Sequence, residues 1–420
     1  MRKSGIGLGL LGGLLLARLA QAGCSEMSVW DPAMGMCMPY PMAGMPMSMA
    51  MLHGNVFGTR IWEEGPRGRD AYASTSMVMG DLGTSIGDRH YLNVDVMATA
   101  EKWTFPDQGY PQFLQIGETN QQGVPFIDAQ HPHSSPIMGL TLSDTIALGA
   151  DRNYLKVFFA PRGEATDGPV AFMHRVTGMA NPDVPLGHHI GQDVGHISST
   201  VIGASIKLDK TRIELSTYHG AEPEPENVDL PIGVPDSVSV RLIEDLFPGW
   251  SAMVSAARVD SPEPDQPSVL FENRYSASVY SQVSFGAEWS FYNTLIYGAV
   301  TQYDSAPVLS SFGEEFLLKG DRPRIWGRFE VLQRTSAELE IPGALHPNDG
   351  QWVAAATLGY THRMASIHFD EQGDGIELGL GGSVTKDFVP GDFIGAYGGN
   401  PWSGKIFLQL GGMQMWGMTP

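Results

Sequence analysis

Residues 271–285 alternate between apolar and polar side chains at almost every step. Odd positions from Phe271 to Phe285 are mostly apolar or aromatic, and even positions carry polar groups such as Glu272 and Arg274. A period of two is the side-chain period of a β-strand, and a strand with one apolar and one polar face suits a wall between lipid and water. Because similar alternation recurs along the chain, the sequence predicts an all-β fold, a transmembrane antiparallel β-barrel of about 16 strands (about 14–18).

The predicted strands have lengths that suit tilted membrane strands. They cover residues 52–62, 71–82, 89–101, 137–148, 153–161, 199–208, 211–219, 237–246, 251–260, 269–283, 286–303, 309–320, 323–334, 351–362, 373–386 and 404–413.

The connections between these strands alternate in length. Every second connection is a short turn, such as 83–88 or 209–210, and the others include the long segments 102–136 and 162–198. Outer-membrane barrels have short periplasmic turns and long extracellular loops, so this sidedness favours a barrel. Only the connection 363–372 is too long for its predicted side. The alternative is a soluble periplasmic β-sandwich or propeller, which also has several short strands.

The first 22 residues have the pattern of an export signal. A basic start is followed by an apolar stretch over 6–16 and by small residues at the expected cleavage site. No later apolar run has the length of a transmembrane helix. We therefore expect a signal peptide at 1–22, a Met-rich N-terminal segment at 23–50 and an outer-membrane barrel at 51–420, in a Gram-negative bacterium.

The chain is acidic, with a formal net charge of −20 at pH 7. This charge argues against nucleic acid as a partner and is compatible with cations. Charged residues are nevertheless only 17% of the chain, while aromatic residues make up 10%. Such a composition suits a protein whose outer wall contacts outer-membrane lipid.

The only two cysteines, Cys24 and Cys37, follow the export signal closely. In an oxidising compartment we expect them to form one disulfide that closes a small loop. The alternative is that Cys37, which lies between two methionines, is a thiolate ligand of a metal ion.

Nine of the 21 methionines lie between residues 27 and 51. Thioethers are soft ligands that select Cu(I), and a Met-x-Met spacing places two of them on one side of an extended chain. In the stretch 45–51, methionine is equally compatible with the lipid or core face of the first strand, as an adaptable filler. The candidate Cu(I) ligands are those of the preceding Pro- and Gly-rich segment: Met34, Met36, Met38 and Met42.

Seven of the 12 histidines fall between residues 131 and 219, on three connections that share the predicted loop side. Imidazole with carboxylate is a ligand set for Cu(II) or Zn(II). The candidate ligands are His131, His133, His174, His188, His189, Asp193, His196 and His219. The alternative is a polar network, including Arg175, that folds the long loops into the barrel mouth without a metal ion.

Four arginines lie on polar faces of predicted strands and are expected to line the lumen: Arg241, Arg274, Arg324 and Arg328. They either set an ion preference or pair with acidic residues and fill the lumen. The chain has no haem-attachment motif, zincin helix or nucleophile elbow, so we expect neither haem nor an enzymatic activity. An outer-membrane metalloenzyme that uses His131 and His133 is a less favoured alternative.

Five segments together resemble a poorly characterised family of Gram-negative outer-membrane β-barrel proteins that is associated with copper and heavy-metal resistance systems. They are Met51-Leu-His53-Gly54-Asn55, Gly65-Pro-Arg67-Gly68, Gln130-His131-Pro132-His133, Ala171-Phe-Met-His174-Arg175 and Gly187-His188-His189. The likeness runs in blocks from about residue 24 to residue 226. Members of that family tend to read His-Pro-His-Asp, whereas Ser134 replaces the acid here, which removes one possible carboxylate ligand.

The expected function is an outer-membrane barrel that binds or passes transition-metal cations, most of all copper, in metal homeostasis. Cu(I) is expected at the methionine segment and Cu(II) or Zn(II) at the histidines, and the resemblance implies periplasmic metal-efflux components as partners. The alternative is a porin-like channel for a small solute, in which the histidines only order the loops.

Overall fold

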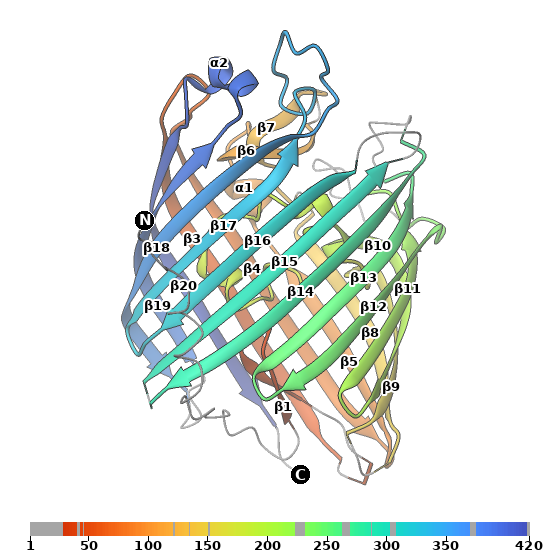
Figure 1. Ribbon diagram of the computed structural model, residues 1–420. Helices are drawn as coiled ribbons and strands as arrows, with labels where there is room; N and C mark the ends of the chain where they lie inside the picture. Colours follow the sequence, from red (N-terminus) through yellow and green to blue (C-terminus); the bar gives the residue numbers. More distant parts are fainter. Residues whose placement is uncertain are drawn as a thin grey trace, which may run out of the picture.

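The computed structural model describes residues 28–39, 43–44, 46–120, 122–133, 135–149, 152–222, 232–262, 269–286, 288–302, 308–369 and 375–417. Sixteen of its strands close into one barrel in which neighbours are antiparallel, and β20 pairs with β3 to complete the ring (Figure 1). The predicted β-barrel is confirmed, and a two-layered sandwich is excluded. None of the helices in this part of the chain is long and apolar enough to cross a membrane.

The barrel strands are β3 (Ser48–Glu63), β4 (Ala71–Ile86), β5 (His90–Ala98), β8 (Ile137–Ala147), β9 (Tyr154–Gly163), β10 (Ser198–Leu208), β11 (Thr211–His219), β12 (Ser237–Phe247), β13 (Trp250–Asp260), β14 (Phe271–Phe285), β15 (Trp289–Gln302), β16 (Leu309–Lys319), β17 (Pro323–Arg334), β18 (Gln351–His368), β19 (Gly375–Phe388) and β20 (Trp402–Trp416).

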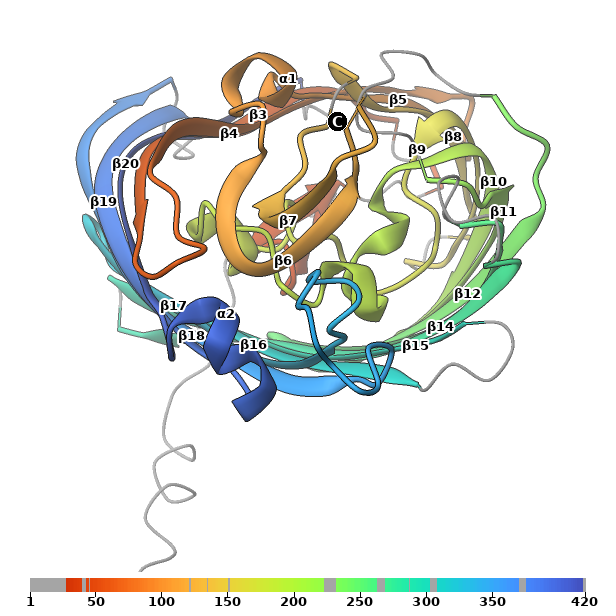
Figure 2. The ribbon, with the colours of Figure 1, turned by 90° about the horizontal axis from the view of Figure 1, so that it is seen from above.

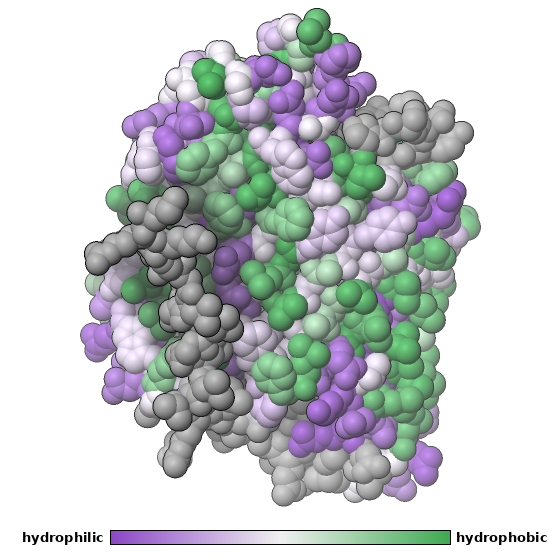
Figure 3. Space-filling view, in the orientation of Figure 1, coloured by the Kyte–Doolittle hydropathy of each residue, from purple (hydrophilic) through white to green (hydrophobic). Residues whose placement is uncertain are grey.

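The two faces of each strand separate lipid-facing from lumen-facing side chains. On β14, Tyr275 is 47% exposed on the outside, whereas Glu272 and Arg274 are buried inside the barrel. Apolar side chains cover much of the outer wall, and hydrophilic ones gather toward the upper rim (Figure 3). The period of two therefore arises because alternate side chains contact lipid on the outer wall and face a polar interior.

Short turns meet at one end of the barrel, here called the turn end, and the long connections meet at the other, the loop end (Figure 1). The predicted sidedness is confirmed. The prediction was wrong at 363–372, because β18 continues to His368 through a register shift between Arg363 and Ala365. Its connection to β19 is consequently shorter and lies at the turn end. The first barrel strand also begins earlier than predicted, at Ser48.

Two segments from the loop end fold into the barrel, and Figure 2 shows a hairpin and an irregular segment inside the ring of strands, with a short helix at its rim. One follows β5 and consists of α1 (Glu101–Thr104) and a hairpin of β6 (Tyr110–Thr119) and β7 (Pro125–Gln130). The other, residues 164–197, is called the plug segment and contains η1 (Gly178–Ala180), η2 (His188–Gln192) and η3 (Val194–His196). The sequence did not predict strands β6 and β7. At the rim, η4 (Gly391–Phe393) and α2 (Ile394–Tyr397) precede β20.

The N-terminal segment enters the barrel from the turn end. Strands β1 (Ser28–Asp31) and β2 (Met36–Pro39) form a hairpin. At its tip, the Ala33 carbonyl accepts a hydrogen bond of 2.9 Å from the Val176 amide of the plug segment. Gly35 at this tip has φ of +66°, and a Cβ there would lie 3.0 Å from the Val176 side chain. The hairpin therefore supports the plug segment from below.

Candidate metal centre

The plug segment is held inside the barrel by hydrogen bonds to lumen-facing side chains. The amides of Thr166 and Gly168 donate to the hydroxyls of Ser216 and Ser255, each at 2.9 Å. The Val170 amide donates to the Tyr280 hydroxyl, also at 2.9 Å. Because a buried amide without a partner is costly, these wall side chains allow an irregular segment to cross the lumen.

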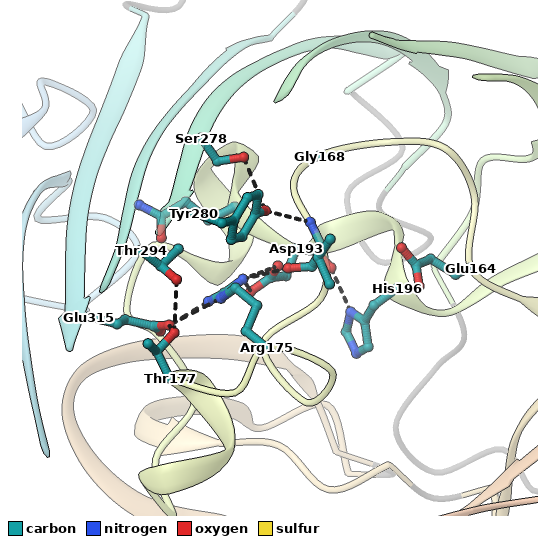
Figure 4. A network of polar contacts seen from close by, with 12 residues as sticks. Glu164, Gly168, Arg175, Thr177, Asp193, His196, Ser278, Tyr280, Thr294 and Glu315 are labelled. Carbon is teal, nitrogen blue, oxygen red and sulfur yellow. Dashed lines mark hydrogen bonds and ion pairs between the residues drawn. The ribbon is translucent and has the colours of Figure 1, made fainter. Parts of the chain in front are cut away.

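Arg175 forms ion pairs both within the plug segment and with the barrel wall (Figure 4). Its side chain is fully buried, with Nη1 3.0 Å from Asp193 Oδ1 and Nη2 3.0 Å from Glu315 Oε1 on β16. Thr177 Oγ1 donates to Glu315 Oε2 at 2.8 Å. Burial opposes the charge, but the carboxylates of Asp193 and Glu315 outweigh it and raise the pKa of Arg175. A permanent cation between two carboxylates thus fixes the chain on both sides of η2.

Two glycines let the plug segment touch the backbone of the wall. Gly191, in η2, has φ of +68°, and a Cβ there would lie 2.8 Å from the Ala299 amide nitrogen on β15. A Cβ on Gly298 would lie 2.0 Å from the Ile190 carbonyl oxygen. A glycine inside a strand is typical of such a close backbone approach. This contact places the adjacent His188 and His189 against the wall.

Five histidines from the two inward-folded segments form one group, called the histidine cluster: His131, His133, His188, His189 and His196. One ligand nitrogen from each of His131, His188 and His189 lies within 4.8 Å of the other two. The imidazole rings of His188 and His196 have centroids 4.8 Å apart. A cavity of about 10 Å³ is lined by four of the five histidines, His131, His133, His188 and His189. This volume suits a single ion or water molecule.

The closest pair in the cluster is His133 and His196, whose Nε2 atoms are 3.1 Å apart. The Nδ1 atom of His133 lies 2.7 Å from Glu101 Oε2, and that of His196 lies 2.6 Å from the Asp193 carbonyl oxygen. A carboxylate and a carbonyl only accept, so both Nδ1 atoms carry hydrogen. In neutral rings both Nε2 atoms then carry lone pairs, and these face each other.

Two facing lone pairs need a proton or a cation between or beside them. Two nitrogen ligands of one tetrahedral metal ion, each at about 2.0–2.1 Å from it, lie roughly 3.3 Å apart. The 3.1 Å separation of the Nε2 atoms is close to that value. Metal-binding histidines also typically donate their other N–H to a carboxylate or a backbone carbonyl. The geometry therefore fits coordination of one metal ion by His133 and His196.

Burial favours the neutral form of four imidazoles in the cluster, those of His131, His188, His189 and His196. It lowers the pKa of His131 to about 4 and lowers the pKa values of His188, His189 and His196 well below the ordinary range, with neighbouring histidines acting in the same direction. A neutral imidazole offers its lone pair to a metal ion without first losing a proton. Within the described part of the chain, His188 Nδ1 and His189 Nε2 are buried and make no hydrogen bond.

The other predicted ligands on these loops lie elsewhere. Asp193 contributes its backbone carbonyl to His196, while its carboxylate pairs with Arg175. His219 pairs with Asp236 at 3.0 Å. His174 belongs to the plug segment but lines a different cavity on its turn-end side. Burial lowers the pKa of His174 to about 4.

The N-terminal candidates are only partly described. Met34 lies near the hairpin tip and lines the same cavity as His174. Met36, Met38 and Cys37 are placed through the backbone of β2, and their side chains lie outside the description. Met42, Cys24 and the signal peptide lie outside the described residues, so the expected disulfide stays a prediction.

All four predicted lumen arginines face the interior, and each is paired with an acidic residue. Arg241 bonds Glu214 at 2.6 Å, and Arg328 bonds Glu315 at 3.1 Å. Arg274 contacts Asp167 of the plug segment at 3.4 Å. Arg324 pairs with Glu377. Of the two predicted roles, the structure shows pairing that helps fill the lumen.

Glu101 is the functional residue that sequence reasoning missed in the cluster. It lies in α1, about 32 positions before His133 in the chain. It also accepts a hydrogen bond of 3.1 Å from the His133 amide. No periodic pattern marks this position, and only the return of the β6–β7 hairpin brings the two residues together.

Comparison with known proteins places the fold. No family model and no curated protein matches the sequence. Among solved structures, OmpF of Salmonella typhi, in complex with daunomycin, aligns over 92% of this chain and 100% of that chain, with a TM-score of 0.52 and 10% identity. An anion-selective porin from Comamonas acidovorans aligns over 89% of this chain and 99% of that chain, with a TM-score of 0.50 and 11% identity. The fold is that of an outer-membrane porin.

These likenesses concern the fold, because the identities are low. With the apolar outer wall they place the chain in the outer membrane of a Gram-negative bacterium, in contact with lipid. They do not connect it with copper or heavy-metal resistance, so the metal remains a hypothesis.

Proposed function

We propose that this porin-like barrel is an outer-membrane channel whose cargo is a transition-metal cation, and that the histidine cluster binds this cation at the plug segment. Imidazole ligands suit Cu(II) and Zn(II). The proposal assigns binding and passage, and no reaction, to the site.

The pair of Nε2 atoms of His133 and His196 carries the proposal. Their Nδ1 atoms are committed to Glu101 and to the Asp193 carbonyl, which directs both lone pairs to one point. A histidine that only stabilises a loop needs one hydrogen bond from its ring. Bringing two acceptor nitrogen atoms to 3.1 Å would not stabilise the loop further. Three more neutral histidines beside this point offer further nitrogen ligands.

The second candidate is a channel for another small solute, in which the histidines only order the loops. The porin fold favours it, as does the polar network around Arg175, which holds the plug segment without any metal ion. This candidate predicts ion conductance that does not depend on metal and no stoichiometric metal binding.

Binding of Zn(II) and Cu(II) to the purified, detergent-solubilised full chain tests the proposal. We expect about one Zn(II) per chain, lost in the double variant His133→Ala/His196→Ala. Glu101→Gln should weaken binding by about 10- to 100-fold, because it removes the carboxylate that orients His133. His90→Ala is the matched control, since His90 also pairs with a carboxylate, Asp144, at 2.8 Å but lies at the turn end.

Two results would overturn the proposal. One is the absence of binding tighter than about micromolar by either metal. The other is an equal loss of affinity in His90→Ala and in the double variant. In either case the second candidate becomes the better account, and planar-bilayer conductance without added metal would support it.

A further inference from the structure

Methionine and histidine side chains form a continuous patch on the lumen face of β3, β4 and β5. The strand register places His53 opposite Met79, and Met79 opposite Met97. The next row reads Met51, Asp81 and Asp95 across the same three strands. Directly opposed residues of antiparallel strands have Cβ atoms about 4.5–5.5 Å apart, so the side chains of each row lie within reach of one another.

This patch borders a cavity of about 450 Å³ on the turn-end side of the plug segment. Met49, Met51, Met79 and Met97 line the cavity from the wall, and with His53 they are called the methionine wall. Met34 of the N-terminal hairpin and His174 of the plug segment line the same cavity. Thioethers from two separate parts of the chain and an imidazole therefore meet at one space.

The same strands use different apolar residues on their two faces. Their lipid-facing positions carry branched aliphatic side chains such as Leu82, Val94 and Val96, which are 63%, 36% and 40% exposed. Methionine stands on the opposite face, which in a porin-like barrel is polar. A need for apolar filler alone does not account for this separation, because leucine fills space as well as methionine does.

Buried polar atoms of the patch lack hydrogen-bond partners. If the patch served only for packing, such atoms would be expected to have partners. His53 is only 6% exposed, and its Nε2 atom makes no hydrogen bond within the described part of the chain. The same holds for Asp81 Oδ2 beside it. A buried polar atom without a partner is unfavourable unless a ligand completes it.

Further thioethers extend from this patch toward the histidine cluster. A smaller cavity of about 50 Å³ is lined by Met77, Met138 and Met173 and also by Glu101 and His133. The first three side chains pack with Met97 in one buried cluster. Methionine side chains therefore lie between the methionine wall, through Met97, and the small cavity that His133 lines.

We propose that the methionine wall, together with His174, is a second metal site that binds a soft monovalent cation, Cu(I) or Ag(I). Thioethers select such ions, whereas the imidazole group above suits borderline divalent ions. The inference rests on the proposed function in one respect, that cations enter the lumen. The ions it assigns to this site are soft monovalent cations, which the histidine cluster does not select.

Ag(I) binding to the purified full chain tests this site, because Ag(I) needs no reductant. The triple variant Met51→Leu/Met79→Leu/Met97→Leu conserves side-chain volume, and such exchanges are usually well tolerated. We expect it to lose Ag(I) affinity at least about tenfold and to keep the Zn(II) affinity of the wild type. Met47→Leu is the control, since Met47 immediately precedes β3 and is buried, but it packs against Tyr91.

X-ray absorption at the silver edge on the wild-type protein gives a readout that requires no variant, and sulfur neighbours are expected. The inference is overturned if only nitrogen and oxygen neighbours are found, or if the triple variant and Met47→Leu bind Ag(I) like the wild type. Failure of the histidine cluster has a different signature, because it removes Zn(II) binding and leaves Ag(I) binding in place.

Discussion

The histidine cluster and the methionine wall differ in what holds their side chains in position. The methionine wall stands on β3, β4 and β5, whose register is fixed by the closed barrel. The histidine cluster stands on two segments without barrel pairing, and these depend on contacts such as that of Arg175 with Glu315. A site on barrel strands forms when the barrel forms. A site on the inward-folded segments also requires the contacts that hold those segments in place.

The two groups also offer different ligand types, imidazole and thioether, on opposite sides of the plug segment. The five clustered imidazoles lie on the loop-end side of the plug segment, and the methionine wall lies with His174 on its turn-end side. Changes that loosen the plug segment should therefore affect the first group strongly and the second weakly.

The largest effect is expected from Arg175→Ala. It leaves the carboxylate of Asp193 buried without its cation, whereas Glu315 keeps its pair with Arg328. Breaking such a buried pair costs about 3–5 kcal/mol. Denaturant unfolding should show lower stability of the plug segment, and Zn(II) affinity should fall by about 10- to 100-fold. Ag(I) should still bind, because the strand-borne ligands remain.

Arg258→Ala is the control for this variant. Arg258 pairs with Asp260, but both side chains are exposed, at 51% and 38%, and exposed pairs contribute about 0–1 kcal/mol. Equal losses of Zn(II) and Ag(I) binding in Arg175→Ala would contradict the separation of the two sites.

Acid should loosen the metal-free plug segment before it affects the wall. Within the plug segment, burial lowers the folded-state pKa of His174 to about 4, below the ordinary 6.5, and lowers those of His188, His189 and His196 well below it. Below pH 6.5 the unfolded segment binds more protons than the folded one, so its stability is complete above 6.5 and declines as pH falls toward 4. Hydrogen exchange, corrected for intrinsic rates, should show protection falling between pH 7 and pH 5 in residues 164–197 but not in β14. Parallel loss of protection in both regions would count against this account.

The smallest effect is expected from His219→Ala. His219 pairs with Asp236, but their side chains are 27% and 35% exposed, and such pairs contribute about 0–1 kcal/mol. Zn(II) and Ag(I) affinities should both match the wild type in titrations of the purified protein. A loss of Zn(II) binding would place His219 with the cluster and would require the loop between β11 and β12 to move inward.

The wall of the barrel could be predicted from the sequence because its physical signal is local. Each strand separates lipid from lumen within a few residues, so alternation marks it directly, as at Tyr275 and Arg274. Strand ends were less certain, since a register shift such as that at Arg363 has no periodic signal. Strands β6 and β7 were missed because they lie inside the barrel and have no lipid-facing side to mark them.

The candidate sites could be predicted only in part. The five clustered histidines were singled out because their loops share one end of the barrel, yet the same reasoning also included His174 and His219. Glu101 was missed because its contact with His133 arises from the return of a hairpin. Met79 and Met97 were missed because an apolar side chain on the lumen face looks, in sequence, like an interruption of the alternation.

The hydrogen bonds of the plug segment have a consequence for the order in which the molecule can assemble. Several partners of residues 164–197 lie on strands that follow them in the chain, at Ser216, Ser255, Tyr280 and Glu315. The segment therefore cannot complete its contacts until most of the later strands have joined the ring. The histidine cluster would be completed late in barrel formation, so a chain in transit through the periplasm carries these imidazoles but not yet the pocket that arranges them.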